Sequence, residues 1–591
     1  MDLAEQNMYT DSKKGAMHVF IKTTRAHGYE YIKLVESRRE GGKPQHHVLF
    51  NFGRADLIKK DASFLRIVRR LCEIAEIEVS PEKPTNVMSL LEGCSEATFY
   101  NYGYLAYLRL WKNLGIEPIL KKLQRGCTKT QYPIDESVFL MAVQHLLEPR
   151  SKLATSERQS RYFNWREIPL HHLYRSLDKL GDWKEDIESE LFTFNYVRMG
   201  QQVEVVFYDV TTFAFESVKT DELRAFGYSK DCKFNEVQVV MGMIIDTNGI
   251  PIGYELFPGN TFDGKTMLAA LANIGKRFGI RRVIIVADRG INSKGNLKSI
   301  KEAGYGYIMA SKIRGMGKSM KEKILSPESF TVITNAQGEE SFRYKTLPYT
   351  NVFTDEDKVK HSLDENLIIS YSPKRAAKDK QDRERLIEKA RKLLESPEKI
   401  EALNKRGGKK YIDKVNPKQK DTWTLAMEKI EQDSLFDGYY GIQTSEKNMD
   451  APEVMEAYHT LWKIEESFRI MKSTMEVRPI FHWTKERIKG HFVVCFLAFM
   501  MERRLELLLK EHTDELSASP GRIQEALNTM QLAALTANDE ELFLKVKAHP
   551  LANKIFRLLK INMPKNVNKA HELVEHLKLI PLVVEPCQIS F

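Results

Sequence analysis

Residues 203–217 read VEVVFYDVTTFAFES, a run of β-branched and aromatic residues with an aspartate, Asp209, in its middle. Such residues favour a strand, and four apolar residues directly precede the aspartate. Two further stretches of this kind follow, VQVVMGMIID (237–246) and IPIGYELF (250–257), joined by the turn sequence Thr-Asn-Gly. The pattern predicts three successive antiparallel strands.

The next segment alternates helix and strand signals. A helix is predicted over 263–278, and RRVIIVAD (281–288) is a continuous apolar run of the kind that is buried on both faces of a sheet. A second helix opens near Ser293, and YGYIMASKI (305–313) follows as a strand. Three antiparallel strands, then helix, strand, helix and strand, is the order of a ribonuclease-H-like core. We therefore expect a multidomain α/β protein with such a core.

Positive charge is concentrated locally along this chain, whose formal net charge is +10. Residues 18–54 alternate as a three-stranded antiparallel meander and hold seven Lys or Arg against three Glu. The segment 148–163 holds four cations near aromatic residues, namely Arg150, Lys152, Arg158 and Arg161. Both segments suit contact with a nucleic-acid backbone. The alternative in each case is an ordinary solvated face.

These patterns divide the chain into six regions. We expect a basic β-meander and linker at 1–90, a helical DNA-binding region at 91–200, the first part of the core at 201–310, a strand-rich insertion with a charged helix at 311–447, the second part of the core at 448–510 and a helical region at 511–591.

The amino-terminal sequence and the cysteines further limit the class of protein. The amino terminus lacks the apolar core of a signal peptide, and no run approaches the roughly 20 apolar residues that cross a bilayer, so we expect a cytoplasmic protein without a membrane partner. The six cysteines lie far apart without a C-x-x-C pair, which indicates neither a zinc ribbon nor a disulfide framework. We interpret them as small buried hydrophobic residues.

Two aspartates belong to neighbouring strands of the predicted core. Asp209 lies inside the first strand, and Asp288 ends the fourth, where a strand of an open sheet delivers side chains to a crevice. The first and fourth strands are adjacent in a ribonuclease-H-like order, so the two carboxylates would meet. The alternative for Asp288 is the turn or cap role that aspartate often takes at the end of a strand.

The stretch YHTLWKIEESFRIMK (458–472) supplies a third acid. In a continuous helix with about 100° per residue, Glu465 falls on the same apolar stripe as Leu461 and Phe468. Glu466 lies roughly 100° further round, toward solvent. Because a carboxylate among core residues is normally paired or metal-bound, Glu465 is the glutamate with a special role.

Three carboxylates held together form an oxygen cage suited to Mg²⁺ or Mn²⁺. Two such ions can activate a water or a 3′-hydroxyl for in-line attack on a phosphodiester. Asp209, Asp288 and Glu465 are therefore candidate catalytic residues and metal ligands for phosphoryl transfer on nucleic acid. For Glu465, the alternative is a buried ion pair with Lys472 or Arg469.

Several stretches of the chain resemble the DDE transposases of bacterial insertion sequences, in particular the IS4-related group and most closely the IS1634-type transposases. The stretches are YDVTTFAFES, GYSKDCKFNEVQVVMGMIIDTNGIPIGYELFPGNTFDGKTM, VIIVADRGINS and LWKIEESFRIMKSTMEVRPIFH, and the resemblance extends to EPRSKLA and the amino-terminal meander. Asp209, Asp288 and Glu465 stand at the positions of that family's acidic triad.

The resemblance implies a transposase that binds the terminal inverted repeats of an insertion sequence and catalyses metal-dependent strand cleavage and strand transfer, in cut-and-paste transposition. It implies two Mg²⁺ or Mn²⁺ ions per active site, transposon-end and target DNA as partners, a homodimer that bridges two ends, and a prokaryotic, nucleoid-associated location. The alternatives are a stand-alone structure-selective nuclease on the same core and a domesticated DNA-binding protein that no longer cleaves.

The IS4-related signature contains a Tyr, an Arg, a Glu and a Lys at fixed spacing. Tyr458, Glu465 and Lys472 match it in register, whereas Leu461 stands at the arginine position. The resemblance implies that Tyr458 and Lys472 hold the DNA end near the scissile phosphate. Arg469, one turn before Lys472, is the candidate for the missing guanidinium.

Overall fold

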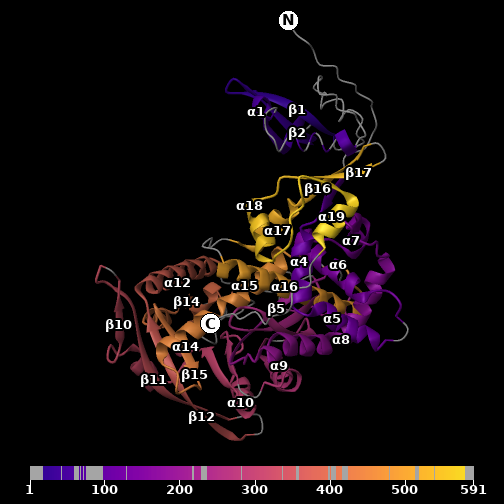
Figure 1. Ribbon diagram of the computed structural model, residues 1–591. Coiled ribbons are helices and arrows are strands. Elements are labelled where there is room, and N and C mark those ends of the chain that lie inside the picture. The colour runs from indigo at the N-terminus through magenta and orange to yellow at the C-terminus, as the bar shows by residue number, and fades with distance from the viewer. Residues whose placement is uncertain are drawn as a thin grey trace. The chain divides into compact units, whose positions relative to one another are not determined.

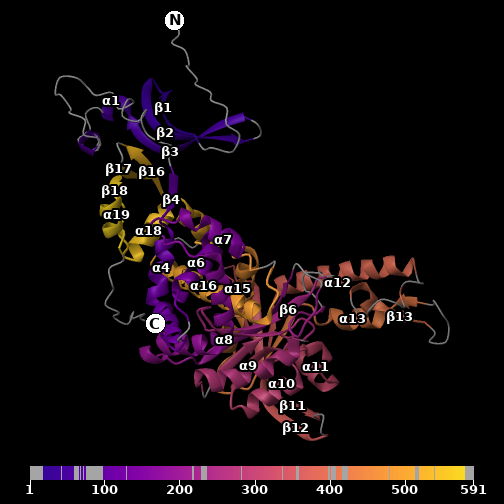
Figure 2. The same cartoon turned by 90° about the vertical axis from the view of Figure 1, so that its right-hand side faces the viewer.

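The computed structural model describes residues 18–40, 43–58, 66, 68, 70, 72–74, 98–127, 130–215, 219–227, 236–261, 263–280, 283–335, 337–354, 358–396, 400, 407–415, 423–477, 480–512, 518–537 and 540–578 (Figures 1 and 2). The chain forms two compact units. The first contains the chain up to Asp182 and again from Gly490, and the second is Trp183–Lys489.

A nine-stranded sheet, in the order β10-β11-β12-β15-β9-β8-β5-β6-β7, organises the second unit. Five of its strands are those predicted for the core: β5 (Val205–Ala214), β6 (Gln238–Ile245), β7 (Pro251–Pro258), β8 (Ile284–Ala287) and β9 (Gly306–Ala310). β6 pairs antiparallel with β5 and β7, whereas β8 pairs parallel with β5 and β9. The predicted adjacency of the first and fourth strands is therefore present.

Two helices connect these strands where the sequence predicts them. Helix α9 spans Asp263–Phe278, and α10 (Lys294–Glu302) begins after Ser293, whose hydroxyl accepts a hydrogen bond from the backbone N–H of Asn296. Side chains of both helices pack with β5 and β8 in one apolar core that includes Val206, Tyr208 and Ala287. Because side chains alternate along a strand, the remaining residues of β5 face the opposite side of the sheet.

The insertion adds its strands to the core sheet. β15 (Tyr439–Thr444) pairs with β9, and β12 (Lys360–Tyr371), β11 (Glu340–Thr354) and β10 (Thr331–Thr334) follow outward, all antiparallel. The predicted charged helix is α12 (Pro373–Leu394), of whose residues only Ala390 is buried. Together with α13 (Met427–Ser434) and the hairpin β13–β14 (Ile412–Lys414, Trp423–Leu425), it projects from the sheet (Figure 2).

The helix predicted to run through Glu465 is interrupted. Helix α14 (Ala451–His459) starts with a capping box in which Asp450 and Glu453 bond reciprocally, and it ends before Thr460. A new helix, α15 (Trp462–Ser473), follows. The hydroxyl of Thr460 donates to the carbonyl of Glu456, a local bond of the kind that bends or ends helices. The prediction of one continuous helix is therefore wrong.

The first unit holds the predicted three-stranded meander, β1 (His18–Ala26), β2 (Tyr29–Glu40) and β3 (Lys43–Arg54), in the order β1-β2-β3. Its first turn, His27-Gly28, has positive φ at both residues, 52° and 79°, as a two-residue hairpin of type I′ requires.

Several helices belong to the described part of the first unit. They are α4 (Tyr104–Asn113), α5 (Ile116–Arg125), α6 (Ile134–Leu147), α7 (Lys152–Arg158), much of α8 (Leu170–Asn195) and most of α16 (Lys485–His512). Among the described helices, none is long and apolar enough to cross a membrane.

The predicted helical region at 511–591 contains strands as well as helices, and the short strand predicted at IPLVV (580–584) lies outside the described residues. Beside α17 (Pro520–Asn528), α18 (Pro550–Leu558) and α19 (Ala570–Leu577) stand three strands, β16 (Gln531–Ala537), β17 (Glu540–Lys545) and β18 (Val567–Lys569). They form a four-stranded sheet with β4 (Thr98–Asn101). Because β4 lies more than 400 residues earlier in the chain, local sequence patterns do not reveal this pairing.

Candidate active site

The strand register brings Asp209 and Asp288 to neighbouring positions. β5 and β8 pair in parallel with Tyr208 opposite Ala287, and each aspartate is the next residue of its chain segment. Adjacent strands lie about 4.8 Å apart. Since Tyr208 and Ala287 point into the core beneath α9 and α10, both aspartates project from the opposite face. Asp209 is half-buried and Asp288 is exposed.

Helix α15 carries Glu465 along this same face. Near its start, the amine of Lys463 donates to a backbone carbonyl of the β6–β7 turn at 2.6 Å. Near its end, the amine of Lys472 lies 5.8 Å from the ring centroid of Phe213, which shares the face of Asp209 on β5. Glu465 lies between these two anchors. The helix therefore places the third predicted carboxylate beside the strand that carries the first.

The exposure of the two glutamates is the reverse of the prediction. Glu465 is exposed and Glu466 is half-buried. The buried side chains of α15 are Ile464, Ser467, Phe468, Ile470 and Met471. The prediction centred the apolar face on Leu461 and Phe468, whereas the buried face of α15 is turned toward Ile464 and Met471, which leaves Glu465 outside it. An exposed Glu465 also excludes the buried ion pair that was its alternative explanation.

Two tyrosines near the predicted acids bond each other. The hydroxyls of Tyr440, on β15, and Tyr458, on α14, lie 2.8 Å apart in a hydrogen bond. Burial, above all, raises the pKa of Tyr458, and the bond to Tyr440 and the negative charges of Asp288 and Glu465 raise it further. Both carboxylates therefore lie within electrostatic reach of one hydroxyl, that of the signature tyrosine.

A cavity of about 510 Å³ opens beside Asp288. Its lining consists of Asp288, Arg289, Gly290, Lys312, Arg375 and Tyr440. The guanidinium of Arg375, at the start of α12, lies 4.3 Å from the ring centroid of Tyr440, within cation–π distance. Three cations, Arg289, Lys312 and Arg375, therefore line the cavity next to the carboxylate of Asp288.

Sequence reasoning did not identify these three cations. Arg289 and Lys312 follow the ends of β8 and β9, and the end of a strand in an open sheet is where functional side chains gather, so a signal was present for both. Arg375 had no such signal, because it is one of many cations in a charged helix. The pairing of β12 with β15 and of β15 with β9 brings it to the site.

In the described part of the chain, the three carboxylates are not among the groups of ligand atoms close enough together to hold a metal ion. Over the described ranges, the one group of three or more His, Cys, Asp or Glu residues whose ligand atoms all lie within 4.8 Å is in the first unit. The donors themselves, carboxylate oxygens on an accessible face, are those that Mg²⁺ and Mn²⁺ prefer.

The remaining predicted DNA contacts have different surroundings. Arg469 is exposed four residues after Glu465, on the same helix face, and Lys472 is half-buried. In the first unit, Arg161 is exposed, whereas Arg158 lies 3.0 Å from a carboxylate oxygen of Glu148.

One cation of the 148–163 segment does not fit the predicted role. Lys152 is 4% exposed, because α7 turns it inward toward His145. It therefore lies on neither a phosphate-contacting nor a solvated face.

Comparison with known proteins places the chain within a family. The family model described as "Transposase DDE domain" matches residues 201–501, more than half of the chain, and "IS1634 family transposase, N-terminal domain" matches residues 20–82. Among solved structures, the cryo-EM structure of the piggyBac transposase synaptic complex with hairpin DNA is 8% identical, with a TM-score of 0.34, and the match covers 73% of this chain and 82% of that one. No curated protein matches the chain.

Proposed function

We propose, from the premise that this chain belongs to the DDE transposase family and is of the IS1634 type, that Asp209, Asp288 and Glu465 are its catalytic triad. As a member, the chain is a metal-dependent DNA-cleaving enzyme. The proposed reaction is cleavage at the ends of an insertion sequence and transfer of those ends to target DNA. The observation that carries the assignment is the pair of aspartates on adjacent parallel strands, with α15 on the same face.

The strand order supports a ribonuclease-H-like catalytic core. The core strands lie in the order β7-β6-β5-β8-β9, with β7, β6 and β5 antiparallel and β5, β8 and β9 parallel. This is the order expected of such a core, and the insertion strands extend the sheet beyond β9. The matched family model begins just before β5 and ends within α16, so it includes all three acids.

The donor set fits two Mg²⁺ or Mn²⁺ ions. Asp209 and Asp288 offer oxygens from adjacent strands, and Glu465 offers a third carboxylate from a helix that packs on β5. When bound, such ions supply an activated water or 3′-hydroxyl and stabilise the leaving oxygen. Exposure of Asp288 and Glu465 leaves the site open to a DNA strand.

The cavity beside Asp288 suits the phosphates that flank the reacting bond. Arg289, Lys312 and Arg375 supply positive charge there, and Arg375 stacks on Tyr440, which in turn bonds Tyr458. Tyr458, Lys472 and Arg469 would hold the DNA end near the scissile phosphate.

This arrangement suggests a replacement for the missing signature arginine. Leu461, at that position, is buried at 6% exposure. Arg375, from the insertion, places its guanidinium over the ring of Tyr440, and Tyr440 is the hydrogen-bond partner of Tyr458. We assign the missing function to Arg375 as well as to Arg469.

End recognition would belong to the first unit. Its meander and Arg161 present cations to solvent, and a homodimer would bridge the two transposon ends before target DNA is joined.

A strand cleavage and joining assay tests the proposal. The purified protein is incubated with duplexes that carry the element's own ends and with a target plasmid, in Mg²⁺, in Mn²⁺ or with a chelator. We expect cleaved ends and joined products with either metal and neither product with the chelator. Binding of the ends without cleavage in any metal would overturn the proposal, and cleavage without joining would indicate a stand-alone nuclease.

A further inference from the structure

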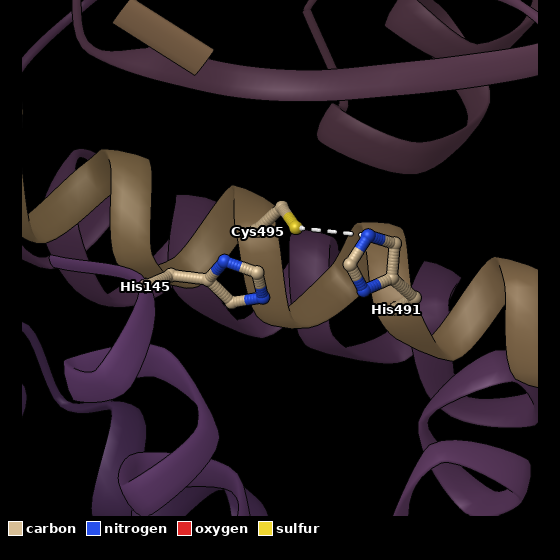
Figure 3. A group of neighbouring side chains, drawn as sticks. All are labelled: His145, His491 and Cys495. Atoms are coloured by element: carbon tan, nitrogen blue, oxygen red, sulfur yellow. Dashed lines mark hydrogen bonds between the residues drawn. The ribbon is translucent and has the colours of Figure 1, made fainter. Parts of the chain in front are cut away.

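A buried cluster of nitrogen and sulfur ligands lies in the first unit, outside the proposed catalytic site (Figure 3). It consists of His145 on α6 and of His491 and Cys495 on α16. The three residues are at most 4% exposed, and their ligand atoms all lie within 4.8 Å of one another. Neither DNA cleavage nor end binding, as proposed above, uses any of them.

Two of the ligands already have the spacing of a metal site. His491 and Cys495 are four residues apart and so share one face of α16. Nε2 of His491 lies 3.7 Å from Sγ of Cys495. Ligand bonds of about 2.3 Å to sulfur and 2.0–2.1 Å to nitrogen place sulfur and nitrogen about 3.6 Å apart on a tetrahedral zinc ion. Sγ of Cys495 and Nε2 of His491 are therefore already separated by nearly the distance that a shared zinc ion requires.

His145 supplies the third ligand from a second helix. Its ring centroid lies 5.5 Å from that of His491, and Figure 3 shows the two rings on either side of the turn that carries Cys495. The contact of 3.7 Å between Sγ of Cys495 and Nε2 of His491 is a weak hydrogen bond, and a metal ion would hold both of these ligand atoms more strongly.

A buried cation beside the cluster makes the anionic ligand, Cys495, the most important one for metal binding. The amine of Lys152 lies 3.0 Å from Nε2 of His145 and is itself buried. A cation enters such a pocket only if an anion accompanies it. A thiolate at Cys495 is the one anionic ligand of the trio, and thiolate with imidazole is the donor set of zinc rather than of magnesium.

We propose that His145, His491 and Cys495 bind a divalent zinc-type metal ion that ties α6 to α16 in the first unit. Because the three ligands are buried and none takes part in the proposed chemistry, the role of the ion is structural, with water in the fourth position of its tetrahedral shell. The site differs from the carboxylate site of the second unit in ligands and in preferred ion. Loss of the ion would lower the stability of the helical part of the first unit, but it would remove no group that the proposed cleavage reaction uses.

Cobalt(II) is the probe, because its spectrum reports both thiolate ligation and tetrahedral geometry. The full-length protein, stripped with a chelator and returned to Mg²⁺ buffer, is titrated with Co²⁺. We expect a thiolate-to-cobalt charge-transfer band and intense visible d–d bands that saturate near one ion per chain and disappear when Zn²⁺ is added. The midpoint of thermal unfolding should rise with Zn²⁺. A wild-type protein without the charge-transfer band would overturn the proposal whatever the variants do.

Variants identify the ligands. Cys495→Ser should abolish the charge-transfer band, and His145→Gln and His491→Gln should each weaken Co²⁺ binding at least tenfold, as loss of a ligand predicts. Cys127→Ser is the matched control, since Cys127 is a free, half-exposed thiol of the same unit outside the cluster, and it should leave the spectrum unchanged. Circular dichroism verifies the fold of each variant. A band that survives Cys495→Ser in a folded protein, or that is lost in Asp288→Ala, would contradict the assignment.

Discussion

At the scale of the residue, we expect Glu465 to act in catalysis and Glu466 to contribute only to packing. Glu465→Gln keeps the size of the side chain but removes a negative ligand, so we expect strand cleavage to fall by orders of magnitude with little change in stability. Glu466→Gln, at a half-buried position, should retain cleavage within a few-fold and cost about 1 kcal/mol at most. Single-turnover cleavage rates and thermal unfolding of both variants measure the two effects. Loss of cleavage in Glu466→Gln alone would transfer the role to that residue.

Single residues also show what the sequence can and cannot reveal. Asp209 and Asp288 were predictable neighbours, because strand pattern and strand order together set their register. Glu465 could be singled out by its register in the signature, but its exposure could not, because the choice of buried face on α15 depends on how that helix packs in the fold. Arg375 reaches the site only through pairing of distant strands, which no local pattern encodes.

At the scale of the element, the join between insertion and core contains a buried acid. Glu365 on β12 is 2% exposed and bonds the hydroxyl of Tyr307 on β9 and the amide of Gln443 on β15. Burial raises the pKa of Glu365 from 4.5 to about 7, although these hydrogen bonds oppose the shift. The folded sheet therefore holds this proton more tightly than the unfolded chain does.

This raised pKa predicts a pH dependence of the insertion strands. Their stability is highest below the unfolded pKa of about 4.5 and falls as pH rises toward about 7, by roughly 3 kcal/mol, because ionisation of the buried carboxyl is unfavourable. Hydrogen exchange of β12 and β15 amides measures the local free energy of opening. Glu365→Gln should remove most of the fall, whereas Asp364→Asn, the exposed neighbour, should not. An equal pH dependence in wild type and Glu365→Gln would contradict the assignment.

Element pairing also explains which parts of the fold escaped prediction. The five core strands follow one another closely in the chain and carry strong β-branched patterns, so their type and order could be predicted. The continuation of the sheet into β15 and β12, and the sheet that joins β16 to β4, depend on partners far away in the chain. Strand propensity depends on such partners more than helix propensity does.

At the scale of the whole molecule, end binding and chemistry should respond to different variants. We expect end binding to weaken with salt by about 0.9 log units per log unit of salt for each phosphate neutralised. Arg161→Ala should lower that slope, whereas Arg158→Ala should lower it less, because Arg158 is paired with Glu148. Arg375→Ala should slow cleavage more than it weakens binding. Equal slopes in wild type and Arg161→Ala would return Arg161 to an ordinary solvated role.

The most direct test of the central claim is strand cleavage by Asp209→Ala and Asp288→Ala, measured together with binding of the element's ends. The account predicts that either change abolishes cleavage and joining in Mg²⁺ and in Mn²⁺, while end affinity and thermal unfolding stay close to those of the wild type, because basic residues elsewhere hold the DNA. Asp364→Asn serves as the control for loss of an acid in the same unit. Cleavage at the wild-type rate in a folded Asp209→Ala or Asp288→Ala protein would contradict the account.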